Sequence, residues 1–151
     1  MSEHTLNLKD ALEYMLAGKS IFTLQNSTNG NRYTFKIKKL KNKDLWFVSV
    51  LTGNNNENDY TFLGTIFYSN NKYNYKHSLK SRATKDAVSV KVITWFLEKI
   101  QVNKVPDFIK FYHMNHCGRC GRTLTVPESV TSGYGPECIQ LVVRNRNLVL
   151  A

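Results

Sequence analysis

Acidic residues are scarce in this sequence of 151 residues, which has 11 of them against 21 lysines and arginines and a formal net charge of +10. Such an excess of positive charge attracts polyanions, nucleic acids first and acidic proteins second. The same lysines would also keep an ordinary domain in solution. Charge alone therefore does not separate DNA, RNA and an acidic protein as partners.

Long apolar runs are missing as well. No stretch approaches the roughly 18 apolar residues that would suggest a membrane span. The first ten residues lack the basic and apolar regions of a secretory signal. We therefore expect neither membrane association nor secretion.

Cysteine is also scarce, and the few cysteines are close together. Cys117, Cys120 and Cys138 all lie within 22 residues. An odd number in one segment argues against a disulfide framework and for a reducing compartment. The C-x-x-C pair is the spacing that two thiolates need to bind one metal ion, and Cys138 adds a third sulfur. The sequence therefore predicts a structural zinc site.

The fourth zinc ligand is expected to be a histidine, because three thiolates and one imidazole complete a tetrahedral shell. His116 is adjacent to Cys117, and neighbouring side chains usually diverge. We therefore favour His113, which lies four residues before Cys117, and keep His116 as the alternative. Such a site contributes on the order of 10 kcal/mol to the folding of a small segment. A chelator should thus unfold the C-terminal segment before the rest of the chain.

Motifs of the common enzyme classes are absent. A nucleobase deaminase has an H-x-E motif before its P-C-x-x-C, whereas here the C-x-x-C comes first and no H-x-E precedes it. The sequence contains no P-loop, no G-x-S-x-G and no G-x-G-x-x-G. His77 could act as a general base, but no partner for it is identifiable. We therefore interpret the protein as a non-enzyme.

Hydrophobic periodicity predicts an α+β domain over residues 1–104, with a mainly antiparallel sheet of four or five strands and two helices. The expected helices cover residues 6–16 and 84–100. The expected strands cover residues 20–25, 32–40, 45–51, 60–68 and 72–76.

A lysine ridge accompanies one of these strands. Tyr33, Phe35 and Ile37 alternate with basic and polar residues, as in a half-buried strand. The lysines that form or extend the outward side are Lys36, Lys38, Lys39 and Lys41. They are either a surface that binds a polyanion or a charged sheet face that prevents edge-to-edge aggregation.

Residues 105–151 are predicted to form a separate zinc module with a treble-clef-like arrangement. Pro106 marks the junction, because proline disfavours helix at the residue before it. A zinc knuckle at the C-x-x-C is followed by a short strand, one helical turn and a helix beginning at Pro136. Four arginines of this module are candidates for binding a partner, namely Arg119, Arg122, Arg144 and Arg146.

The segment His113-x-x-x-Cys117-Gly-Arg-Cys120-Gly-Arg-Thr-Leu-Thr-x-Pro-Glu-Ser-Val, with Gly133-Tyr-Gly-Pro-Glu-Cys138, resembles a small zinc-finger-like domain of unknown function that recurs in bacteriophage and actinobacterial proteins. The resemblance covers residues 112 to about 142, less than a quarter of the chain. It implies the ligand set His113, Cys117, Cys120 and Cys138, and a phage or mobile-element origin. It implies no reaction.

Together these features predict a basic, phage-type zinc-binding protein that binds nucleic acid without catalysis, in the cytoplasm of a bacterial host cell. Phosphate neutralisation would make its affinity fall steeply with salt. The alternative is a phage-encoded inhibitor that binds a host protein of nucleic-acid metabolism or defence. No small-molecule substrate is evident.

Overall fold

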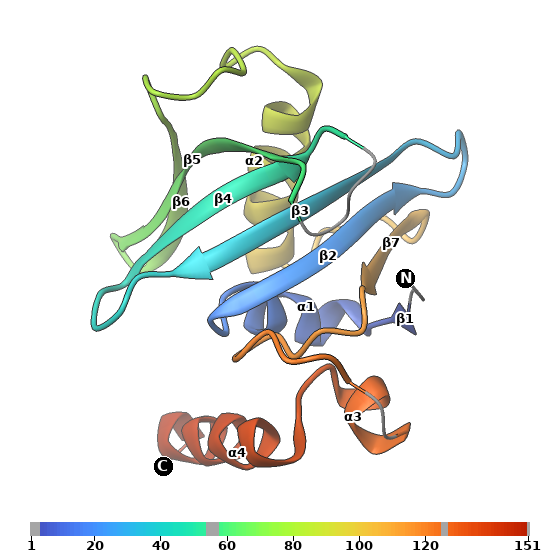
Figure 1. Cartoon of the computed structure of the whole chain (residues 1–151), viewed down its shortest axis with the longest axis vertical. Helices are drawn as coiled ribbons and strands as arrows, with labels where there is room; N and C mark the ends of the chain where they lie inside the picture. Colours follow the sequence, from blue (N-terminus) through green and yellow to red (C-terminus); the bar gives the residue numbers. More distant parts are fainter. Residues whose placement is uncertain (1–3, 54–57, 125–126, 151) are drawn as a thin grey trace.

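The computed structural model describes residues 4–53, 58–124 and 127–150 of the chain (Figure 1). Its helices are α1 (Leu8–Met15), α2 (Val88–Gln101), α3 (Pro127–Ser132) and α4 (Pro136–Leu150). Its strands are β1 (His4–Thr5), β2 (Lys19–Asn26), β3 (Arg32–Lys39), β4 (Leu45–Leu51), β5 (Tyr60–Ser69), β6 (Lys72–His77) and β7 (Ile109–His113). Within the described residues, no helix is long and apolar enough to cross a membrane.

The strands form one antiparallel sheet in the order β1-β7-β2-β3-β4-β5-β6. Strands β2 to β6 follow one another as a meander, and the chain then returns through α2 to the opposite edge. There β7 pairs with β2, with Phe111 opposite Leu24, and β1 pairs with β7. The α+β class and the antiparallel sheet are confirmed.

The expected number of four or five strands was too low, because β1 and β7 also belong to the sheet. Strand β7 has only five residues and forms by pairing with a strand more than 80 positions earlier in the sequence. Periodicity within so short a segment cannot reveal such a distant partner. The predicted boundary at residue 104 therefore assigns to the metal module a strand that the sheet contains.

The sheet buries one face against helices α1 and α2, which lie behind it in Figure 1. Alternate residues of the central strands supply this core face, including Phe22, Phe35 and Val48. Phe111 of β7 stacks on Phe22, with ring centroids 4.9 Å apart. Phe111 also stacks on Phe96 of α2, with ring centroids 6.1 Å apart. The core thus joins the central strands, β7 and α2.

Helix α2 begins at Val88 rather than at Thr84. Residues 84–86 are exposed, and Ala87 is extended and provides no side-chain cap. Since helix stability in proteins comes mostly from packing of an apolar face, the helix begins only where Val90 and Ile93 reach the core. Helix α4 begins at Pro136, as the sequence predicted.

No helix of the described residues covers the other face of the sheet over strands β3 to β6. We call this the open face and define it by seven of the residues that alternate with the core residues there, namely Lys36, Lys38, Phe47, Ser49, Phe62, Thr65 and Lys76. The register places them side by side across the four strands, and none of them is buried. The viewer of Figure 1 looks at this face, with α1 and α2 on the far side.

Candidate metal centre

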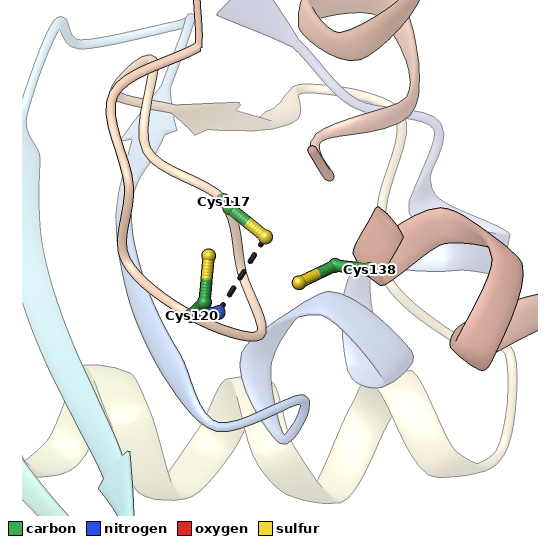
Figure 2. A group of neighbouring side chains, drawn as sticks. All are labelled: Cys117, Cys120 and Cys138. Carbon is green, nitrogen blue, oxygen red and sulfur yellow. Dashed lines mark hydrogen bonds between the residues drawn. The ribbon is translucent and has the colours of Figure 1, made fainter. Parts of the chain in front are cut away.

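Three cysteines from two separate segments meet beside the sheet. Cys117 and Cys120 belong to the turn that follows β7, and Cys138 belongs to the first turn of α4 (Figure 2). Their sulfur atoms all lie within 4.8 Å of one another. Sulfurs that share a zinc ion with bonds of about 2.3 Å lie about 3.8 Å apart, so a small adjustment brings these thiols to one ion. The group can hold a metal ion, as the cysteine spacing predicted.

The turn that holds Cys117 and Cys120 is a knuckle closed by backbone hydrogen bonds. The Gly121 amide donates to the Cys117 carbonyl, and the Cys117 amide donates to the Arg122 carbonyl, both at 2.8 Å. Gly121 has a φ of 80°, a conformation that glycine adopts without a steric penalty. The Cys120 amide donates to the Cys117 sulfur at 3.5 Å, which Figure 2 draws as a dashed line.

The surroundings shift the pKa values of Cys117 and Cys138 in opposite directions. Burial of Cys117 opposes its ionisation, but amide donors from Cys120, Gly135 and Arg119 outweigh burial and lower the pKa of this thiol. Burial raises the pKa of Cys138 to about 11, although the Arg119 guanidinium, 3.6 Å from its sulfur, lowers it in part. Thiolates are the form that binds metal, so these amide donors favour the form of Cys117 that a metal ion needs.

His113 is not part of the thiol group, and its hydrogen bonds explain why. Its Nε2 lies 2.6 Å from the Val130 carbonyl, so it carries a proton and donates. Its Nδ1 accepts from the Asn115 amide at 3.2 Å. A ligating imidazole needs a free lone pair, and here the two nitrogens donate to and accept from the backbone. In this structure both nitrogens of His113 bond to the backbone, and its role as the fourth ligand stays a prediction.

His116 has a different hydrogen-bond pattern. Its Nδ1 lies 3.0 Å from the Gly121 carbonyl and donates to it. Histidines that bind metal often donate their other N–H to a carbonyl in this way. His116 nevertheless lies outside the group of ligand atoms found among the described residues, which contains the three thiols alone.

The cysteine segment is attached to the sheet domain through Tyr14 of α1. The Tyr14 hydroxyl donates to the His116 carbonyl at 2.6 Å. The Tyr14 ring centroid lies 5.8 Å from those of both His113 and Tyr134. A Cβ atom on Gly118 would lie 2.6 Å from the Tyr14 ring, so only glycine fits at that position of the knuckle.

The predicted binding residues fall into separate places. Lys36 and Lys38 lie on the open face. Three others line a cleft of about 730 Å³ between α1, β4 and α4, namely Lys39, Arg119 and Arg146. In that cleft Arg146 pairs with Glu13 at 2.7 Å and Lys39 lies 3.8 Å from Asp44. Lys41, Arg122 and Arg144 are exposed outside both groups.

Lys76 of the open face, and Lys19 next to Lys38, were not among the binding residues that the sequence predicted. Lys19 pairs with Lys38 across β2 and β3, and Lys76 pairs with Thr65 across β5 and β6. A signal existed for Lys76, which lies between half-buried neighbours in a β-prone segment, whereas Lys19 precedes five consecutive buried residues and shows no alternation. Their position beside Lys38 and Thr65 depended on the register, which the sequence does not state.

Neither a curated protein nor a solved structure matches this chain. One family model does match part of it, over residues 111–141. This range contains the end of β7, the knuckle, α3 and the start of α4, and thus all three cysteines. The C-terminal part of the chain is therefore similar to a family of unknown function, DUF6011.

Proposed function

We propose that this protein is a non-catalytic nucleic-acid-binding protein whose C-terminal segment is held by a structural zinc ion. Nucleic acid binds on the open face, and the metal centre attaches α3 and α4 to the sheet. The net charge of the chain favours nucleic acid as a partner, and the open face is the surface that would bind it. The proposal narrows the candidate residues to Lys36 and Lys38, with Lys76 added.

The observation that carries this proposal is the distribution of charge in the sheet. The strands contain no aspartate or glutamate, and they contain eight cations, which are Lys19, Arg32, Lys36, Lys38, Lys39, Lys72, Lys76 and Lys110. Three of these lie on the open face. A sheet whose strands carry cations and no acidic residue attracts phosphate groups.

The cleft between α1 and α4 is a poorer candidate for this role. Its cations Arg146 and Lys39 have carboxylate partners in Glu13 and Asp44. The third, Arg119, donates to the Cys138 sulfur. A polyanion would have to displace these contacts, whereas on the open face it meets lysines next to aromatic and hydroxyl side chains.

Zinc is the metal that the donor set favours. Three thiolates are soft ligands, which favour Zn²⁺ over Mg²⁺ or Ca²⁺, and a histidine as fourth ligand would close the tetrahedral shell of a structural site. The buried Cys117 belongs to the hydrophobic core, which supports a role in folding. Residues Cys117, Cys120 and Cys138 would hold the ion.

The proposal is tested by nucleic-acid affinity at about 50 and about 200 mM salt. Three phosphate contacts, one for each lysine of the open face, predict a loss of roughly 20- to 40-fold between these concentrations. The double variant Lys36→Glu/Lys38→Glu should weaken binding at least about tenfold and flatten the salt dependence. The matched control is Lys85→Glu/Lys91→Glu, an equal charge change at exposed positions on and before α2.

Equal losses in both double variants would indicate a net-charge effect and remove the open face as the binding surface. No binding at all to DNA or RNA would leave the alternative, an inhibitor of a host protein of nucleic-acid metabolism. That protein would be recovered from host lysate with the tagged chain after nuclease treatment. Recovery that depends on the open-face lysines but survives nuclease would also favour the alternative.

A further inference from the structure

We propose that the open face binds single-stranded rather than duplex nucleic acid, with a base stacked on Phe47. This inference rests on the proposed function and adds the form of nucleic acid to it. The lysines hold phosphates, and the aromatic side chains between them hold bases.

The register places an aromatic ring within a basic row. Phe47 of β4 pairs with Lys38 of β3 on one side and with Thr65 of β5 on the other, and Thr65 pairs with Lys76 of β6. Strands are about 4.8 Å apart, so the row from Lys38 to Lys76 spans roughly 14 Å. A chain of a few nucleotides crossing the sheet can contact both lysines and the ring between them.

Phe47 is an apolar side chain left uncovered at the centre of this row. It is 41% exposed, although the equivalent residues of the core face are almost fully buried. The centroids of the Phe47 and Phe62 rings lie 5.6 Å apart at an interplanar angle of 81°, so the two rings meet edge to face. A partly exposed ring thus lies beside lysines, which is the arrangement of a stacking platform for bases.

A second ring extends the same surface. The Lys36 Nζ lies over the Tyr60 ring, 5.2 Å from its centroid. Ser49 of β4 pairs with Lys36 of β3 on one side and with Phe62 of β5 on the other. Lys36 therefore lies on the strand next to the one that contains Phe47. The cation–π contact orients Lys36 along the face, where a phosphate can replace water at its ammonium group.

The exposed Phe47 ring favours single-stranded over duplex nucleic acid. In a duplex the bases stack on one another, and only phosphates, sugars and groove edges reach a sheet surface. A duplex would use the lysines and leave Phe47 in water. A single strand has free base faces, so it can cover Phe47 and neutralise its phosphates at the same time.

The experiment compares a single-stranded oligonucleotide of about twelve residues with a duplex of the same sequence, by fluorescence anisotropy of a labelled strand. Phe47→Ala should weaken single-strand binding roughly 5- to 150-fold. It should leave duplex affinity and the salt slope unchanged, because it removes no charge. Phe47→Leu keeps an apolar side chain for folding and should show a similar loss.

The control is Tyr68→Ala, which removes an aromatic side chain that is 48% exposed and contacts Tyr73, a residue that packs on the core. Its single-strand affinity should equal that of the wild type. Lys36→Glu/Lys38→Glu should weaken binding of both forms of nucleic acid.

The outcomes separate the two proposals. If the lysine variant weakens both forms but Phe47→Leu changes neither, the open face binds phosphate and this inference is wrong. If the wild type binds the duplex more tightly than the single strand, the inference is also wrong. If neither the lysines nor Phe47 matter, the proposed function fails with it. Loss of single-strand affinity alone in Phe47→Leu, with an unchanged melting temperature, supports the inference.

Discussion

Tyr14 shows how a single residue connects the sheet domain to the cysteine segment. It is fully buried, and the chain approaches its ring closely at Gly118 and Gly133. Burial raises the pKa of its phenol, and the nearby Cys117 raises it further. The hydroxyl therefore stays protonated and remains a donor to the His116 carbonyl. The Tyr14 hydroxyl and ring thus help to position the knuckle, together with the Lys19 amide, which donates to the Gly118 carbonyl at 2.8 Å.

Replacement of this hydroxyl should measure the connection. Tyr14→Phe keeps the ring and removes the donor, which leaves the His116 carbonyl without that bond, so we expect a loss of about 1 to 3 kcal/mol in unfolding free energy. Urea unfolding followed by circular dichroism gives the value. Tyr68→Phe, at a half-exposed ring, should change stability by less than about 0.5 kcal/mol. Equal values for the two variants would contradict the role of the Tyr14 hydroxyl.

Helix α4 is held to the rest of the chain by polar as well as apolar contacts. Beyond Cys138 and Val142, its described contacts with the rest of the chain include the pair of Arg146 with Glu13 of α1. The hydrogen bond to Glu13 raises the pKa of Arg146, and Tyr134 donates to the same carboxylate. The side chains are 41% and 34% exposed, so solvent screens the pair and limits its contribution.

Arg146→Leu should therefore cost only about 0.5 to 1 kcal/mol of global stability. Its clearer effect should be local, because the second half of α4 loses its link to α1. Hydrogen exchange at the amides of α4 should speed up while exchange in α2 stays unchanged. Arg144→Leu, at an exposed neighbouring position, serves as the control. Faster exchange in both variants would mean that the ion pair is not what holds α4.

The whole molecule consists of a sheet domain and a cysteine segment that share strand β7. The sequence placed their boundary at residue 104, but β7 is hydrogen-bonded to β2 and packs Phe111 into the core. Strand β7 therefore belongs to the sheet and also leads into the cysteine segment. Because the three thiols join the turn after β7 to α4, loss of the metal should free the chain from that point onward.

Removal of metal with a strong chelator should therefore unfold part of the molecule. We expect amides 117–139 to lose protection from hydrogen exchange, because metal binding to such a site contributes on the order of 10 kcal/mol. Amides 109–113 should keep their protection, since β2 holds them. Zinc should restore the lost protection, and Mg²⁺ should not. Loss of protection beginning at residue 105 would instead support the boundary that the sequence suggested.

Sequence patterns were informative where structure depends on neighbours in the chain. Alternation around Phe35 and Ile37 predicted β3, and Pro136 predicted the start of α4. The same reasoning placed Lys36, Lys38, Lys39 and Lys41 on one ridge. The structure separates them, because Lys39 lies 5.6 Å from the Trp46 ring, which belongs to the core side of the sheet. Alternation placed Lys36 and Lys38 on the same face correctly. Lys38 and Lys39 are consecutive in the strand, so they point to opposite faces and cannot share one ridge.

The sequence by itself determined the positive charge, the α+β class and the grouping of three thiols, because composition, periodicity and C-x-x-C spacing are local properties. Only the tertiary structure decided that His113 bonds to Val130 and Asn115, that β7 enters the sheet, and that Phe47 lies in a row between lysines. Each of these depends on segments far apart in the chain. Their pairing is decided by how the whole core packs, which no single stretch of residues encodes.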